Sequence, residues 1–133
     1  MILETQCAPP NSLVLVMGPD GKIPESTNRN LIAATSSCLA IGTRSEIDGD
    51  TTIILTDEPS FELSRKSGQI VYEGKIETPQ GQLSIYTIAG EALLTIATRQ
   101  PHTRIQIWAN DEQEPNEIAI LINRFELQHV VAR

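Results

Sequence analysis

The sequence predicts an all-β fold: a single-domain β-sandwich of about eight mostly antiparallel strands with at most one short helix. Three observations predict it. First, apolar residues alternate with polar ones along much of the chain. Second, turns rich in Gly, Pro and Asp recur at roughly ten-residue spacing. Third, 133 residues suffice for one domain with one core. We expect this core within residues 12–125, and we expect the ends, residues 1–11 and 126–133, to be peripheral.

The first predicted strand covers residues 12–17 and stops at the turn sequence Gly18-Pro19-Asp20-Gly21. A second strand is expected over residues 38–43. The pair Asp48-Gly49 favours a hairpin turn, since Gly adopts positive φ without steric cost. Residues 51–56, rich in β-branched side chains, are therefore expected to return as the partner strand of that hairpin.

The segment 24–37 is the exception to the strand pattern. Ser26 or Thr27 could cap one short helix that continues through residues 31–34. This is the single helix that the sequence allows.

Further strands follow in the second half, where short alternating runs are separated by Pro and Gly turns. The expected strands are residues 61–64, 69–78, 82–88, 92–98, 103–109 and 117–125. In the last of them Ile118, Ile120 and Ile122 alternate with their neighbours, as expected for a strand with one face in the core.

Composition excludes several classes of protein. Seventeen acidic and ten basic residues give a net charge of −7, and 40% of the residues are hydrophobic. That hydrophobic fraction is higher than is typical of a disordered chain. Nucleic acid is not expected as a partner, because phosphate binding needs clustered Lys and Arg.

No secretory signal or membrane span is visible in the sequence. The first residues lack a basic region, and the longest aliphatic runs are far shorter than the roughly twenty residues that a span needs. We expect a cytoplasmic protein without a membrane partner. Cys7 and Cys38 are then expected to be reduced, with Cys38 buried in a strand.

The chain offers few residues for catalysis or metal binding. Neither histidine lies in a known nucleophile motif, and the four residues that could form a zinc site are dispersed rather than closely paired: Cys7, Cys38, His102 and His129. The alternating acids of residues 46–50 do not match a calcium loop, because strand-like residues follow them. The fold could still bring together a Cys–His pair or two carboxylates in a catalytic arrangement, and the sequence leaves this possibility open. We expect no catalytic residue, no metal and no cofactor, and a protein that is not an enzyme.

Trp108 is the only tryptophan and has two interpretations. If Ile105 and Ile107 point into the core, Trp108 points to the opposite face. It could be an exposed interface anchor beside a loop of four acids, or it could cap one end of the core; the sequence favours neither. If it is an anchor, we expect Trp108→Ala to weaken partner binding by about 2 kcal/mol or more. The loop acids are Asp111, Glu112, Glu114 and Glu117.

Further acids concentrate at two other predicted turns. Glu46, Asp48 and Asp50 belong to one, and Asp57 and Glu58 to the other. Loops at the same end of a sandwich cluster in space, so these acids and the loop acids could merge into one negative surface that attracts a basic partner. The alternative is that the acids serve solubility alone.

The order of strands and turns resembles a known family over most of residues 13–122. The features that carry this resemblance are an early strand at residues 13–16, the Gly18-Pro19-Asp20-Gly21 turn, a polar stretch at 25–34, a strand at 37–42 and later strands around the Gly90 turn. The chain is similar to small bacterial immunity and nuclease-inhibitor proteins with a β-sandwich fold, in particular the competence-associated nuclease inhibitors. The resemblance implies a protein without catalytic residues that neutralises a partner enzyme.

The leading hypothesis is a non-enzymatic immunity or inhibitor protein that binds a basic toxin or nuclease through Trp108 and the acids. One alternative is a small ligand-binding or hydrolytic β-barrel, which would need a cavity near His102, Tyr72 or Tyr86. A second alternative is an oligomer-forming module with an exposed strand edge. The oligomeric state stays open.

Overall fold

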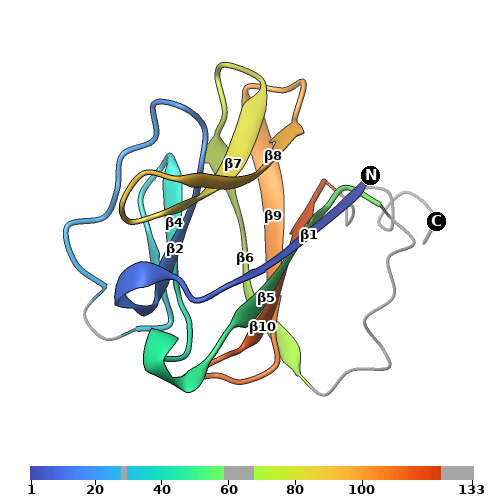
Figure 1. Cartoon of the computed structure of the whole chain (residues 1–133). Coiled ribbons are helices and arrows are strands. Elements are labelled where there is room, and N and C mark those ends of the chain that lie inside the picture. Colours follow the sequence, from blue (N-terminus) through green and yellow to red (C-terminus); the bar gives the residue numbers. More distant parts are fainter. Residues whose placement is uncertain (28–29, 59–67, 124–133) are drawn as a thin grey trace.

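Two β-sheets packed face to face make up the protein (Figure 1). The computed structural model describes residues 1–27, 30–58 and 68–123. Each sheet has five strands, and all neighbouring strands but one pair are antiparallel. The predicted all-β sandwich is confirmed, with ten strands among the described residues in place of about eight.

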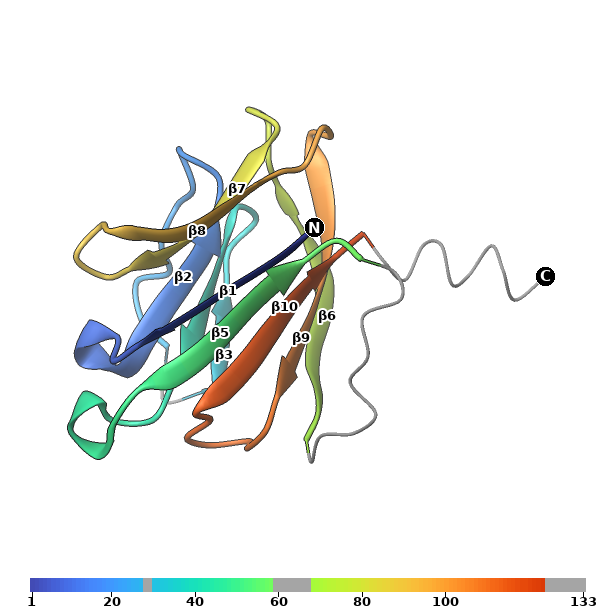
Figure 2. The ribbon, with the colours of Figure 1, turned by 45° about the vertical axis from the view of Figure 1, so that its right-hand side comes forward.

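The first sheet contains the strands that position the acidic loops. Its order is β1 (Ile2–Cys7), β5 (Thr51–Thr56), β10 (Glu117–Ile122), β9 (His102–Ala109) and β6 (Gln69–Glu77). β5 and β10 form the parallel pair, and they lie side by side in the middle of Figure 2. Parallel neighbours begin at the same end of a sheet, so the loops that precede β5 and β10 share one end of the molecule.

The second sheet covers the inner face of the first. Its order is β3 (Ile32–Ala34), β4 (Cys38–Gly42), β2 (Leu13–Met17), β7 (Gln82–Thr87) and β8 (Ala92–Ala97). β2 lies at its centre and pairs with both β4 and β7. The apolar run of β2 is buried at Val14, Leu15 and Val16, so this strand is covered on both faces.

Alternating side chains fill the space between the sheets. The largest fully buried side chains of the first sheet include Ile53, Leu55, Ile107 and Ile120, which all belong to one cluster with side chains of the second sheet. Two smaller clusters lie on the faces that point away from this core. They comprise Ile54, Trp108, Ala119 and Leu121 on the first sheet and Leu15, Cys38 and Ala40 on the second.

The predicted short helix does not form. Residues 32–34 are instead the strand β3, in which Ile32 pairs with Ile41 of β4. The ladder with β4 satisfies backbone groups that a short isolated helix would leave to water, and it outweighs a marginal helix propensity. The helical elements of the described residues are two short 3₁₀ turns, η1 (Pro10–Ser12) and η2 (Glu46–Asp48). Within these ranges no helix is long and apolar enough to cross a membrane.

The prediction of a hairpin at Asp48-Gly49 is wrong. β4 and β5 belong to different sheets, so residues 43–50 are a crossover between the sheets. The glycine is still required, because Gly49 ends η2 at a φ of 121° that side chains rarely adopt. A Gly turn therefore marks the position of the bend without specifying which strands pair.

The N-terminal residues 1–11, expected to be peripheral, contain a strand. β1 pairs with β5 along its whole length, and its Leu3 and Cys7 pack against the core. Cys38 is fully buried in β4, as predicted, and both cysteines are free. The predicted strand at 61–64 and the C-terminal residues 126–133 lie outside the described residues.

Candidate functional site

Two of the three predicted acidic turns lie at the same end of the sandwich. The loop of residues 43–50 leads into β5, and the loop of residues 110–116 leads into β10, the parallel neighbour of β5. The two loops touch directly, because the Arg44 backbone N–H donates a hydrogen bond of 2.9 Å to the Pro115 carbonyl. They lie next to each other at the lower end of the sheet in Figure 2. We call this end of the molecule the acidic end.

The acidic end carries every predicted partner-binding carboxylate. Those carboxylates are Glu46, Asp48, Asp50, Asp111, Glu112, Glu114 and Glu117. All are exposed except Glu117, which is half-buried at the first residue of β10. Asp57 and Glu58 lie at the far end of β5, where both bind the amino group of Met1 at 2.8 and 2.5 Å. They do not join the surface.

One carboxylate of the acidic end was missed at the sequence level. Glu91 lies in the exposed turn between β7 and β8, near Cys7 at the end of β1. Burial, and then the charges of Asp50 and Glu91, raise the pKa of the Cys7 thiol. The Gly90 turn was visible in the sequence, but only the strand directions show that it lies on the same side as the other acidic loops.

The loop of residues 43–50 is held by its own backbone and by Arg44. The Ser45 Oγ accepts a hydrogen bond from the Ile47 N–H at 3.3 Å, and the Asp48 N–H donates to the Ser45 carbonyl at 3.0 Å. The Arg44 Nη2 donates to the Asp50 carbonyl at 2.9 Å. No ion pair links Glu46, Asp48 or Asp50 to another described residue, so their charges face solvent.

The loop of residues 110–116 is closed by side-chain amide and carboxylate groups. The Asn110 Oδ1 accepts hydrogen bonds from the backbone N–H groups of Asn116 and Glu117, at 3.1 and 3.2 Å. The Asp111 Oδ2 accepts from Glu114 and Gln113, at 2.8 and 3.0 Å. These bonds stabilise the charged carboxylate, and they lower the pKa of Asp111 below its ordinary value.

We expect the Asp111 carboxyl to titrate below its ordinary pKa of 3.8. A lowered pKa means that the charged form stabilises the fold above the ordinary pKa, and that this contribution is lost as the pH falls through the lower, folded-state value. An NMR titration of the Gln113 and Glu114 amide signals measures it. The variant Asp111→Asn keeps an acceptor oxygen and should remove the transition; a midpoint at or above 3.8 would contradict the expectation.

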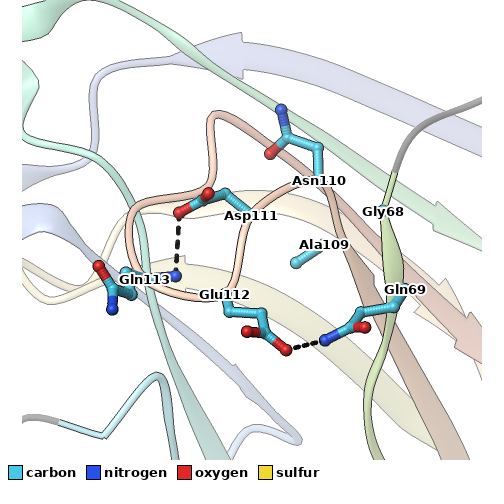
Figure 3. A pocket seen from close by; sticks show the side chains of 7 residues that line it. All are labelled: Gly68, Gln69, Ala109, Asn110, Asp111, Glu112 and Gln113. Carbon is cyan, nitrogen blue, oxygen red and sulfur yellow. Dashed lines mark hydrogen bonds between the residues drawn. The ribbon is translucent and has the colours of Figure 1, made fainter.

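A groove of about 520 Å³ opens between the loop and the start of β6 (Figure 3). The Gln69 Nε2 donates a hydrogen bond to the Glu112 Oε1 across its mouth. The groove is lined by Gly68, Gln69, Ala109, Asn110, Asp111, Glu112 and Gln113. Its polar side chains contribute acceptor oxygens and two carboxylates, a lining that suits the cationic head of a Lys or Arg side chain.

Trp108 is not exposed, and the interpretation of it as a surface anchor is wrong. It points away from Ile107, as the alternation predicted, yet only 3% of its surface is accessible. Its cluster contains Ala119, its direct partner on β10. Gly68 lies against its ring, because a Cβ there would be 2.6 Å from the indole carbon Cζ2. Trp108 is a core residue of the outer cluster.

The comparisons with known proteins bear on the fold. No protein-family model and no curated protein matches the sequence. Among solved structures, ComJ from Bacillus subtilis, an inhibitor of the DNA-degrading activity of NucA, matches with a TM-score of 0.67 and 11% identity over 92% of this chain and 97% of ComJ. The chain has the fold of ComJ. This confirms the β-sandwich that the resemblance to competence-associated nuclease inhibitors implied.

A second solved structure has the same arrangement. The protein described as crocagin biosynthetic gene J matches with a TM-score of 0.55 and 12% identity, over 91% of this chain and 94% of that one. At these identities the likeness is one of fold. The shared fold spans nearly the whole of all three chains, so the acidic loops of this chain are built on a complete sandwich of that type.

Proposed function

We propose that this chain is a non-enzymatic inhibitor or immunity protein that binds a basic nuclease through its acidic end. The observation that carries the proposal is the gathering of six carboxylates on two hydrogen-bonded loops, with Glu117 at the start of β10 beside them, at one end of a fold shared with a nuclease inhibitor. A nuclease recognises DNA with cationic groups that contact phosphates. Clustered carboxylates can occupy those same groups and keep DNA out.

The loops suit this role because they are held in place before binding. The Asp111 carboxylate is bonded to two backbone N–H groups, and the loop of residues 43–50 is joined to Pro115. A surface that is already ordered loses little conformational freedom on association. Its charge also accelerates the encounter with a basic partner.

Two of the residues considered for catalysis, Cys38 and His102, are poorly suited to it. Burial raises the pKa of the Cys38 thiol to about 12, so this thiol stays protonated at neutral pH and is a poor nucleophile. His102 is exposed at the start of β9, at the end of the first sheet away from the acidic loops. The barrel alternative also loses support, because packed side chains fill the space between the two sheets.

The test is inhibition of DNA cleavage. Purified chain is added to Bacillus subtilis NucA and, in parallel, to any nuclease that sequencing finds encoded beside this chain's own gene. We expect at least one of the two activities to fall in proportion to added chain and to vanish near one chain per nuclease, because a tight complex titrates its partner.

An unrelated acidic protein of matched net charge serves as the control. Equal inhibition by that protein would show an effect of charge alone. Full cleavage by both nucleases in a large excess of chain would contradict the proposed function, as would inhibition that scales with DNA rather than with nuclease.

A further inference from the structure

The most exposed large apolar side chain of the described residues belongs to the acidic end. Ile47 has 91% of its surface accessible, against 62% for Met1 and 53% for Ile2. It is the middle residue of η2, flanked by Glu46 and Asp48. Both neighbours are exposed as well, so an apolar side chain projects into water between two carboxylates.

The backbone holds Ile47 in this position from both sides. Its own N–H donates to the Ser45 Oγ, and the Gly49 N–H donates to the Glu46 carbonyl at 3.4 Å. Arg44 holds the base of the turn with two hydrogen bonds. Its Nη2 donates to the Asp50 carbonyl, and its backbone N–H donates to the Pro115 carbonyl of the neighbouring loop. Ile47 is therefore presented by an ordered turn, and little backbone freedom remains to be lost when a partner covers it.

Folding gives no reason for isoleucine at this position. A side chain with 91% of its surface in water gains almost nothing from the core. Turn positions favour Gly, Asn, Asp, Ser and Pro, and a β-branched residue in a 3₁₀ turn lowers its stability. The free energy of removing this side chain from water is available only to an association with another surface.

We propose that Ile47 is the apolar anchor of the acidic end: it enters an apolar socket of the nuclease, and Lys or Arg side chains around that socket pair with Glu46 and Asp48. This inference rests on the proposed function and specifies the partner's surface. An apolar centre surrounded by charges is the usual composition of a binding hot spot, because the rim excludes water from the centre. The acids then determine the encounter, and Ile47 determines how long the complex lasts.

The variant Ile47→Asp separates an anchor from a merely acidic surface. It adds one negative charge to the acidic end, which should maintain or strengthen binding if charge alone attracts a basic partner. A carboxylate in an apolar socket is instead strongly unfavourable. We expect inhibition of the nuclease that the wild-type chain inhibits to weaken by on the order of a hundredfold for Ile47→Asp and tenfold for Ile47→Ala, mainly through faster dissociation.

Matched controls are Ile23→Asp and Ile23→Ala. Ile23 is also exposed, at 46%, and follows Lys22, whose N–H bonds to Ser37 at the far end of the second sheet. These variants should inhibit like the wild type, and Ile47→Val should retain most of the activity. Thermal unfolding checks that all variants fold, as expected for exposed positions.

Each result is decisive. Loss with Ile47→Asp and not with Ile23→Asp supports the anchor. Undiminished inhibition by Ile47→Asp overturns the anchor and leaves the proposed function intact. If the wild-type chain inhibits neither nuclease, the proposed function fails, and the anchor fails with it.

Discussion

Replacing Trp108 with alanine is expected to lower the free energy of unfolding by about 3–5 kcal/mol, the usual cost of truncating a buried aromatic residue. Only 3% of the surface of Trp108 is accessible, and the side chain packs in one cluster with Ile54, Ala119 and Leu121. Truncation removes these contacts and leaves a cavity on the outer face of the first sheet. Chemical denaturation followed by far-ultraviolet circular dichroism measures the change.

Two controls separate a core role from an interface role for Trp108. Trp108→Phe fills part of the cavity and should cost less, and Gln106→Ala on the same strand, where the side chain is only half-buried, should cost little. The wild-type fluorescence should be blue-shifted and protected from quenchers. A red-shifted emission, together with an unfolding free energy that Trp108→Ala leaves unchanged, would contradict the buried position.

The position of Trp108 shows what alternation can predict in this chain. The pattern of β9 assigned Ile105 and Ile107 to the core and Trp108 to the other face, and both assignments are confirmed. It could not show that the other face is also buried there. That burial depends on Ala119 and Ile54, which reach Trp108 only in the folded sheet, where β10 pairs with β9 and β5 lies on the other side of β10.

Strand pairing was the least predictable part of the fold. The turn chemistry at Asp48-Gly49 indicated a bend, and a bend is present, but the chain crosses there from one sheet to the other. Turn residues specify local φ and ψ, which a hairpin and a crossover can share. The parallel pairing of β5 with β10 joins residues 65 positions apart, such as Thr52 and Glu117, a separation at which local patterns carry no information.

The acidic end was predictable in its residues and only partly in its extent. The loops of residues 43–50 and 110–116 do lie together, since their backbones bond to each other, and a single negative surface that binds a partner stays a prediction. Asp57 and Glu58 are excluded because β5 carries the chain away from that end before they occur. Ile47 was overlooked because an isolated apolar residue in a turn has no periodic signal.

Charge reversal at the acidic end is expected to have the largest effect on association. In the variant Asp48→Lys/Glu114→Lys, one carboxylate on each loop becomes cationic, and the net charge changes from −7 to −3, since each reversal adds two units. We expect the association rate with the inhibited nuclease to fall by on the order of tenfold or more at low salt, and its dependence on salt to flatten. Stopped-flow binding at several ionic strengths measures both.

A matched variant shows whether the position of the charges matters or only their sum. Glu73→Lys/Glu77→Lys also brings the net charge to −3, at two exposed residues of β6 outside the acidic loops. The two variants are compared in physiological salt, where charges act over only about 8–10 Å. If the acidic end docks the nuclease, Glu73→Lys/Glu77→Lys should associate there at close to the wild-type rate. Equal losses in the two variants would mean that only net charge attracts the partner, and would contradict docking through the acidic end. Dissociation should change little in Glu73→Lys/Glu77→Lys, which keeps Ile47 and both of its flanking acids, and it should be faster in Asp48→Lys/Glu114→Lys, because Asp48 is expected to pair with a cation beside Ile47.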